Sequence, residues 1–204
     1  MRHKDRPILS AARAASVFKE MVGLRRYCCN DSQYFGMSEI WDDLAEDSDE
    51  INIKFSKSAH LDFDNSKAGV VAFDKFATLI VPETMWAKAV EGDRFANFTL
   101  AHEFAHLALE HHLMSANVKN FQLTNRGNDL ANIPPNSEEL EANYAAVFFQ
   151  CGDALMEPNI DALNLAKRAC TDVYYVKKAI SLCKLEAFRR ELEILYARYE
   201  RVIL

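Results

Sequence analysis

Residues 98–106 read FTLAHEFAH and place two histidines and a glutamate within an apolar run. Bulky and small apolar residues occupy several sides of the helix that this run predicts, which is typical of a helix buried inside a protein. Polar side chains without partners are costly in such a place. The stretch therefore predicts a buried helix whose polar residues act together at one site.

His102, Glu103 and His106 have the spacing of the H-E-x-x-H motif. A helix turns by about 100° per residue, so the two histidines lie one turn apart and can bind one ion at about 2.0–2.1 Å. Glu103 lies beside that face, where it can take a proton from a water. The motif predicts a zinc site with Glu103 as general base. The alternative is a buried histidine pair held by hydrogen bonds, and the motif alone does not decide between the two.

A catalytic zinc site needs a third protein ligand, and the first candidate is His112. It has the outer spacing of the longer motif H-E-x-x-H-x-x-G-x-x-H, but Leu109 occupies the glycine position. On an unbroken helix, His112 is rotated by about 240° from His106, away from the metal face. The sequence therefore favours a ligand from elsewhere.

The second candidate is Glu139, in the stretch NSEELEANYAA at 136–146. This stretch predicts a helix, and Asn143 lies on the same face as Glu139, where it can orient a histidine. Glu138 and Glu141 stay open as alternative ligands, although acidic residues also suit the N-terminus of a helix. We expect His102, His106 and Glu139 to bind the metal.

Composition narrows the class of protein. The chain has 204 residues, half of them hydrophobic, which is enough for one sizeable core. A net charge of −6 argues against nucleic acid or an acidic membrane as the main partner. Five cysteines without a C-x-x-C pair argue against a disulfide framework and against a structural zinc site. With no signal-peptide pattern and no membrane-length apolar run, we expect a cytoplasmic protein with reduced thiols.

The order of predicted elements indicates an α+β fold. We expect a small, mostly antiparallel sheet packed on the H-E-x-x-H helix, with an N-terminal helix and a C-terminal helical tail. The acidic run 41–50 is interpreted as a solvated loop. The predicted elements are a helix at 7–24 ending at Gly23, strands at 51–55, 68–73 and 77–82, a helix from Arg94 to about Leu113 capped by Asp93, a helix at 138–151, and one or two helices within 160–204.

We expect one domain with a helical C-terminal extension. Residues 1–158 form a zincin-like metallopeptidase domain that includes the N-terminal helix, and residues 159–204 form a helical extension. We expect the extension to pack on the same domain, with a dimer or partner seam as the alternative, so the oligomeric state stays open. Cys151, Cys170 and Cys183 lie in apolar helical contexts and are predicted to be small core residues.

The stretch FTLAHEFAHLALEHH at 98–112, followed by ELEANYAA at 139–146, resembles the ImmA/IrrE-like zinc metallopeptidases. That family has an R-x-x-L-A-H-E-L-G-H-like helix and then an E-x-x-A-N/D-x-F-A-like helix. His102 and His106 match its histidine ligands, Glu103 its general base and Glu139 its downstream ligand. Ala105 stands where the family usually has glycine. The resemblance covers roughly residues 50–150.

The resemblance implies a zinc-dependent endopeptidase. It further implies site-specific cleavage of a helix-turn-helix repressor or antitoxin, in a stress response or in control of a mobile element. The net charge, and the lack of an evident helix-turn-helix in this chain, lead us to expect no direct binding of nucleic acid. A non-catalytic zinc protein that binds or senses a regulator is the alternative, and a structural interaction protein is a third. One of the strands at 68–73 or 77–82 is expected to pair with an extended peptide, and residues 115–136 form either a lid or an ordinary connection. Tyr144, His111 and His112 are candidates for stabilising the oxyanion.

Overall fold

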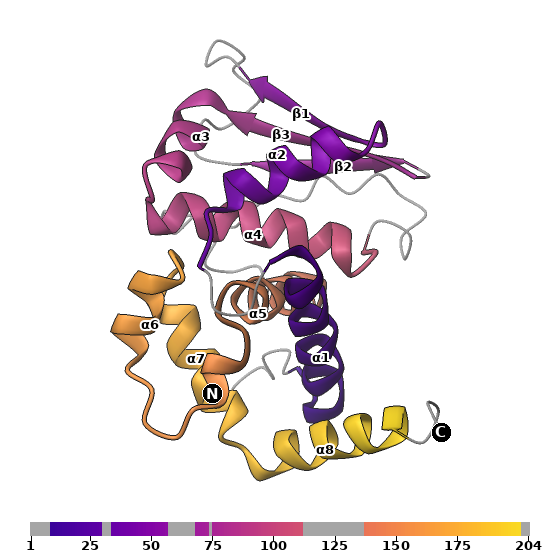
Figure 1. The fold of residues 1–204 in the computed structure, drawn as a ribbon, viewed down its shortest axis with the longest axis vertical. Helices are drawn as coiled ribbons and strands as arrows, with labels where there is room; N and C mark the ends of the chain where they lie inside the picture. The colour runs from indigo at the N-terminus through magenta and orange to yellow at the C-terminus, as the bar shows by residue number, and fades with distance from the viewer. Residues whose placement is uncertain (1–8, 30–33, 57–67, 74, 112–136, 201–204) are drawn as a thin grey trace, which may run out of the picture.

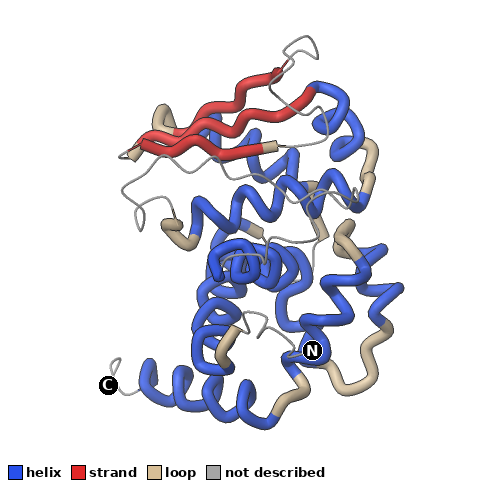
Figure 2. Tube along the Cα trace, turned by 180° about the vertical axis from the view of Figure 1, so that it is seen from behind, coloured by secondary structure: helices blue, strands red, loops and turns tan. Residues whose placement is uncertain are grey.

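The computed structural model describes residues 9–29, 34–56, 68–73, 75–111 and 137–200. It confirms the α+β fold. The sheet lies at one end of the molecule, and α4 lies between the sheet and α5 in both views (Figures 1 and 2). The elements in chain order are α1 (Ala11–Cys28), α2 (Met37–Asp47), β1 (Ile51–Ser56), β2 (Gly69–Phe73), β3 (Phe76–Pro82), α3 (Glu83–Val90), α4 (Arg94–Ala108), α5 (Ser137–Cys151), the 3-10 helix η1 (Gly152–Met156), α6 (Ala162–Arg168), α7 (Val173–Cys183) and α8 (Glu186–Glu200).

The sheet is mixed, with the strand order β1-β3-β2. The predicted hairpin is present, because β2 and β3 pair antiparallel with Val70 opposite Leu79. However, β1 pairs with β3 in parallel, with Ile53 opposite Leu79, so the expectation of a mostly antiparallel sheet needs correction. Parallel neighbours need a long connection between them, and residues 57–75 separate β1 from β3. This order leaves β2 at an edge of the sheet.

Helix α4 is the buried central helix that its sequence predicts. The carboxylate of Asp93 caps its N-terminus by accepting from the Ala96 N–H at 2.8 Å. The helix ends at Ala108 rather than near residue 113. Glu110, two residues later, has a left-handed backbone with φ of 54°, which reverses the chain and stops the helix. Apolar periodicity gave no sign of this ending, because the apolar residues continue past it.

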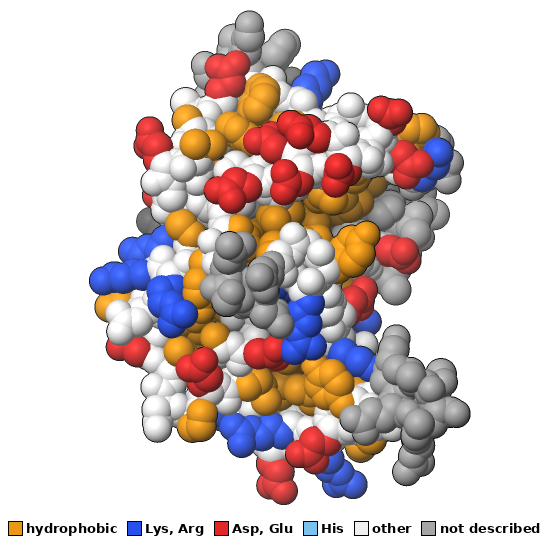
Figure 3. Space-filling view, in the orientation of Figure 1, with side chains coloured by type: hydrophobic (Ala, Val, Ile, Leu, Met, Phe, Trp, Pro, Cys, Tyr) orange, Lys and Arg blue, Asp and Glu red, His pale blue; other side chains and the backbone are white. Residues whose placement is uncertain are grey.

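The acidic run 41–50 is mostly helix α2, and the prediction of a solvated loop is wrong. Met37, Ile40 and Trp41 are buried at helical spacing on one face. The indole of Trp41 donates to the Leu100 carbonyl of α4 at 3.1 Å. Acidic side chains gather on the outer face of α2 (Figure 3). A run of acidic residues is typical of a solvated loop, but here the buried apolar residues anchor a helix. Helix α3 was likewise not predicted.

Helix α1 runs through Gly23 to Cys28, so the predicted end at Gly23 is also wrong. Arg25, in the added turn, is buried and donates from Nη1 to the carbonyls of Phe149 and Gln150, at 2.9 and 3.1 Å. These carbonyls belong to the last turn of α5, where helix carbonyls lack partners within the helix. A contact between segments far apart in sequence therefore accompanies the longer helix.

The C-terminal segment forms three helices, α6 to α8, where the sequence predicts one or two. Asp161 and Asp172 cap α6 and α7 with their side chains. The segment packs on the rest of the chain: the ring of Phe18 in α1 lies 5.1 Å from that of Phe148 in α5 and 5.7 Å from that of Phe188 in α8. Within the described ranges, no helix combines the length and apolar character needed to cross a membrane.

The five cysteines all lie in described residues and form no disulfide. Cys151 and Cys183 are buried, as predicted for small core residues, whereas Cys170 is only half-buried. Cys170 has a left-handed backbone, and its thiol donates to the Gly92 carbonyl at 3.0 Å. It lies in the turn between α6 and α7 rather than in a helix, which is why the prediction of a core position fails there.

Candidate metal centre

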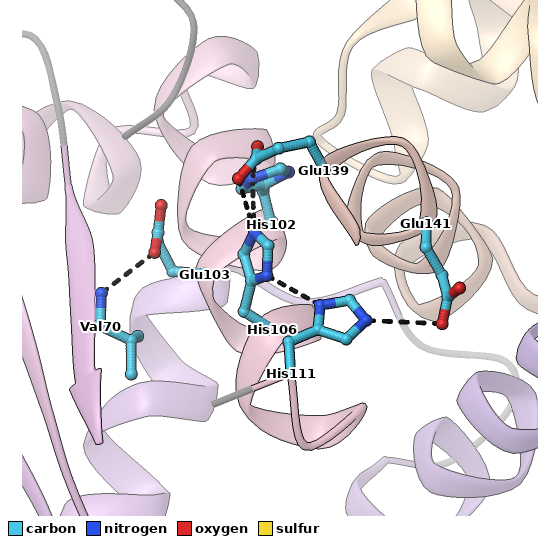
Figure 4. Close-up of polar contacts among 7 residues, drawn as sticks. All are labelled: Val70, His102, Glu103, His106, His111, Glu139 and Glu141. Atoms are coloured by element: carbon cyan, nitrogen blue, oxygen red, sulfur yellow. Dashed lines mark hydrogen bonds and ion pairs between the residues drawn. The ribbon is translucent and has the colours of Figure 1, made fainter. Parts of the chain in front are cut away.

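Helices α4 and α5 bring three predicted residues together (Figure 4). His102 and His106 lie one turn apart on α4, and Glu139 extends from the first turn of α5. The two imidazole Nε2 atoms lie 3.1 Å apart. Glu139 places Oε2 3.3 Å from His102 Nε2 and Oε1 3.6 Å from His106 Nε2. Both imidazoles are only 1% exposed.

The donor set fits a zinc ion. Two imidazoles and one carboxylate are a ligand set of catalytic zinc sites. A tetrahedral ion with ligands at about 2.0–2.1 Å keeps its ligand atoms about 3.3–3.4 Å apart, close to the separations between these side chains. In the part of the chain that the structure describes, His102, His106 and Glu139 form the one group of such residues that could hold a metal. Glu138 and Glu141 lie outside this group.

Glu103 lies next to the group but points toward the sheet. Its Oε2 accepts from the Val70 N–H of β2 at 3.0 Å. Its Oε1 is buried and has no hydrogen-bond partner among the described residues. Burial, and then the negative charge of Glu139, raise the pKa of Glu103 well above its ordinary value, while the hydrogen bond from Val70 opposes that rise. A nearby cation would lower this pKa again.

A second row of polar contacts runs from His106 away from the group. His106 Nδ1 lies 2.8 Å from His111 Nδ1, and His111 Nε2 lies 3.4 Å from Glu141 Oε1. Glu141 also pairs with Arg13 of α1. Burial by itself would raise the pKa of Glu141, but the hydrogen bonds with His111 and Arg13 outweigh it and lower the pKa. The Glu141 carboxylate is thus engaged by His111 and Arg13, and it lies outside the group formed by His102, His106 and Glu139.

The remaining predicted residues have other surroundings. Asn143 is half-buried on α5, and the partner at His106 Nδ1 is His111 instead. Tyr144 is half-buried, with its ring 6.0 Å from that of Phe148 in the core. His112 and the proposed lid at 115–136 lie outside the described residues. The sequence did not predict a role for Arg13. Its partner Glu141 is 128 positions away, and no local sequence pattern indicates such a pair.

The chain was compared with protein-family models, with curated proteins and with solved structures, and no match was found. The residues of the candidate metal centre and the motif resemblance are therefore what bears on function.

Proposed function

We propose that this protein is a zinc-dependent endopeptidase. The observation that carries the proposal is the convergence of His102, His106 and Glu139, whose potential ligand atoms all lie within 4.8 Å of one another. Glu103 supports it, because a buried carboxylate beside such a group is suited to moving a proton. Zinc, when bound, would polarise the scissile carbonyl and make an attacking water more acidic.

The residues of the chain divide the remaining work. His102, His106 and Glu139 would hold the metal. Glu103 takes a proton from the attacking water through its unpartnered Oε1 and passes that proton to the leaving amine. The Val70 N–H holds the other oxygen of Glu103, which keeps the carboxylate oriented while the proton moves. Helix α4 therefore provides two of the proposed ligands and the base, and α5 provides the third ligand.

The edge strand β2 is the surface that we propose for the substrate. The Val70 N–H reaches Glu103, so the edge of β2 that pairs with no other described strand borders the proposed base. An extended peptide can add to such an edge through main-chain hydrogen bonds. Following the motif resemblance, we propose a helix-turn-helix repressor or an antitoxin as the protein that is cut, in a stress response or in control of a mobile element.

Metal analysis tests the site. We expect about one zinc per chain in the purified protein, lost in His102→Ala and in Glu139→Gln because each removes a ligand. Glu138→Gln is the matched control, since it changes the neighbouring carboxylate in the same turn of α5 and should retain zinc. A folded protein that holds no metal and takes up none from added zinc would contradict the proposal.

Cleavage tests the enzyme. The helix-turn-helix protein encoded nearest to this gene would be expressed with the wild type or with Glu103→Gln, and its fragments identified by mass spectrometry. We expect Glu103→Gln to keep zinc but to lower the cleavage rate by about 100-fold or more, because an amide cannot accept the proton. Equal cleavage by both proteins would show that Glu103 is not the base.

A non-catalytic zinc protein is the second candidate. Two observations favour it: the imidazoles are almost fully buried, and one oxygen of Glu103 is already held by Val70. Under this alternative, the wild type and Glu103→Gln bind the regulator equally well and neither cuts it. The cleavage experiment therefore separates the two candidates.

A further inference from the structure

The geometry points to His111 as a positioning residue for the candidate ligand His106, with Glu141 and Arg13 behind it. This inference rests on the metal site of the proposed function and deepens it. The observation behind it is a continuous row of contacts. Figure 4 shows the row from His106 through His111 to Glu141, and Glu141 in turn pairs with Arg13. His111 is 1% exposed, and the side chain of Glu141 is 10% exposed, so water does not easily replace these contacts.

The contacts select one tautomer for each ring. Of two ring nitrogens 2.8 Å apart, one must carry the hydrogen and the other must accept it. His106 directs Nε2 toward Glu139, so as a ligand it presents the lone pair of Nε2 there and carries its hydrogen on Nδ1. That hydrogen is donated to His111 Nδ1. His111 then carries its own hydrogen on Nε2, which faces Glu141 at 3.4 Å.

The local backbone explains why His111 lies beneath His106. After α4 ends, the Glu110 N–H bonds to the Leu107 carbonyl and the His111 N–H bonds back to the His106 carbonyl, each at 3.1 Å. These two bonds, together with the left-handed backbone of Glu110, form a Schellman motif, which turns the chain back on its helix. Glu110 adopts the left-handed backbone without being glycine. The turn places the His111 ring 5.0 Å from the ring of His106.

The two candidate histidine ligands differ in their support. His102 Nδ1 is buried without a hydrogen-bond partner among the residues that the structure describes. His106 Nδ1 has His111, and through it Glu141 and Arg13, which belong to α5 and α1. Partners of this kind hold a ligand ring in the orientation that metal binding needs. The N-terminal helix is thereby coupled to the metal centre through His106.

Zinc affinity is the first test, measured by competition with a chromophoric chelator in the absence of any peptide. Losing such a partner typically lowers metal affinity about 10–100-fold, which we expect for His111→Leu. In His111→Gln we expect affinity much closer to that of the wild type, because the amide oxygen accepts from His106 and the amide nitrogen donates to Glu141. A merely structural role for the ring would not be rescued in this way.

Two arginines of α1 provide a matched pair of variants. Arg13 pairs with Glu141 and Arg26 pairs with Asp153, and their side chains are 40% and 47% exposed. We expect Arg13→Ala to weaken zinc binding less than His111→Leu does, because Glu141 still accepts from His111. Arg26→Ala should leave zinc affinity unchanged. Equal effects of the two arginine variants would overturn the part of the inference that includes Arg13.

The wild type provides a test that does not depend on the folding of any variant. Long-range ¹H–¹⁵N spectra of the zinc-loaded, ¹⁵N-histidine-labelled protein report which ring nitrogen carries hydrogen. We expect His106 with hydrogen on Nδ1 and His111 with hydrogen on Nε2. Hydrogen on Nδ1 of His111, or wild-type zinc affinity in folded His111→Leu, would overturn the inference.

These outcomes separate the inference from the proposed function. A chain that binds zinc with the expected tautomers but cuts no peptide would contradict the peptidase and support the role of His111. A chain that binds zinc and cuts, with equal affinity in His111→Leu, would contradict the inference alone. A wild type that binds no zinc would overturn both.

Discussion

The thiols of this protein are made less reactive by their surroundings. Burial, and then the neighbouring Cys28, raise the pKa of the half-buried Cys29 thiol to about 11. Burial raises the pKa of Cys183 to about 12. The thiolate is the nucleophile, and at pH 8 only about one in a thousand Cys29 thiols is in the thiolate form. Burial, and then the charge of Asp43, also raise the pKa of the adjacent Cys28, so neither thiol has the lowered pKa that is typical of redox-sensing cysteines.

We accordingly expect slow alkylation of the folded protein by iodoacetamide. At pH 8, Cys29 should react far more slowly than after unfolding, and its rate should rise about tenfold per pH unit up to pH 10. Cys183 should stay unmodified until the chain unfolds. Mass spectrometry of quenched samples measures both. A Cys29 rate that levels off below pH 9 would contradict the raised pKa.

The same shifts predict that stability falls in alkali. Below about pH 8.5 both the folded and unfolded chains keep these thiols protonated, so their contribution is fully present. Above that pH the unfolded chain loses protons first, and the free energy of unfolding decreases as pH rises toward the folded pKa values of about 11 for Cys29 and about 12 for Cys183. Replacing Cys183 with Ala should flatten this dependence, measured by urea unfolding at several pH values.

At the scale of elements, α4 depends on its ends as much as on its apolar faces. Asp93 starts the helix with a side-chain cap, and Glu110 stops it in a left-handed conformation. Asn97, in the first turns, accepts from the Met37 N–H at 2.7 Å and donates to the Ala89 carbonyl at 2.9 Å. These contacts join α2 and α3 to the helix that carries both imidazoles.

The cap of α4 can be tested directly. Asp93→Ala removes the acceptor for the Ala96 N–H, and we expect it to lower the free energy of unfolding by about 1 kcal/mol. Asp93→Ser keeps a capping oxygen and should recover most of that loss. Urea unfolding followed by circular dichroism measures the difference. If Asp93→Ala and Asp93→Ser were equally destabilised, the cap would not be the cause.

On the scale of the whole molecule, α1 connects segments that are far apart in sequence. Phe18 packs its ring against Phe148 and Phe188, and Arg25 binds the end of α5. The three phenylalanines are each at most 1% exposed. The C-terminal helix α8 is thus part of the core that supports α5, and α5 in turn carries Glu139.

Phe188→Ala tests whether α8 belongs to the same core as α1 and α5. We expect a loss of about 3–5 kcal/mol, which lowers the melting temperature of the whole chain by about 2–4 °C for each kcal/mol. Leu185→Ala, at a position 52% exposed, is the control and should change stability little. Calorimetry should show one transition in each protein. A separate early transition in Phe188→Ala would indicate that the C-terminal helices unfold by themselves.

Sequence reasoning succeeded where a signal was local and repeated. The helix of His102 and His106, its Asp93 cap, the hairpin of β2 and β3, and helix α5 follow from periodicity and capping residues. The prediction failed for α2, because the acidic residues indicated a loop although a short apolar stripe favours a helix. It also failed for the end of α1, because Gly23 lies inside the helix instead of ending it. The parallel pairing of β1 had no local signal, because strand order depends on contacts between distant segments.

The sequence by itself determined which side chains are available to a metal and their spacing on each helix, since 3.6 residues per turn places His102 and His106 on one face. The tertiary structure alone decided that Glu139, rather than Glu138 or Glu141, approaches both imidazoles. It also decided that Arg13 lies behind His111. Packing of α1, α4 and α5 sets these distances, and no single segment contains the information because the partners come from different helices.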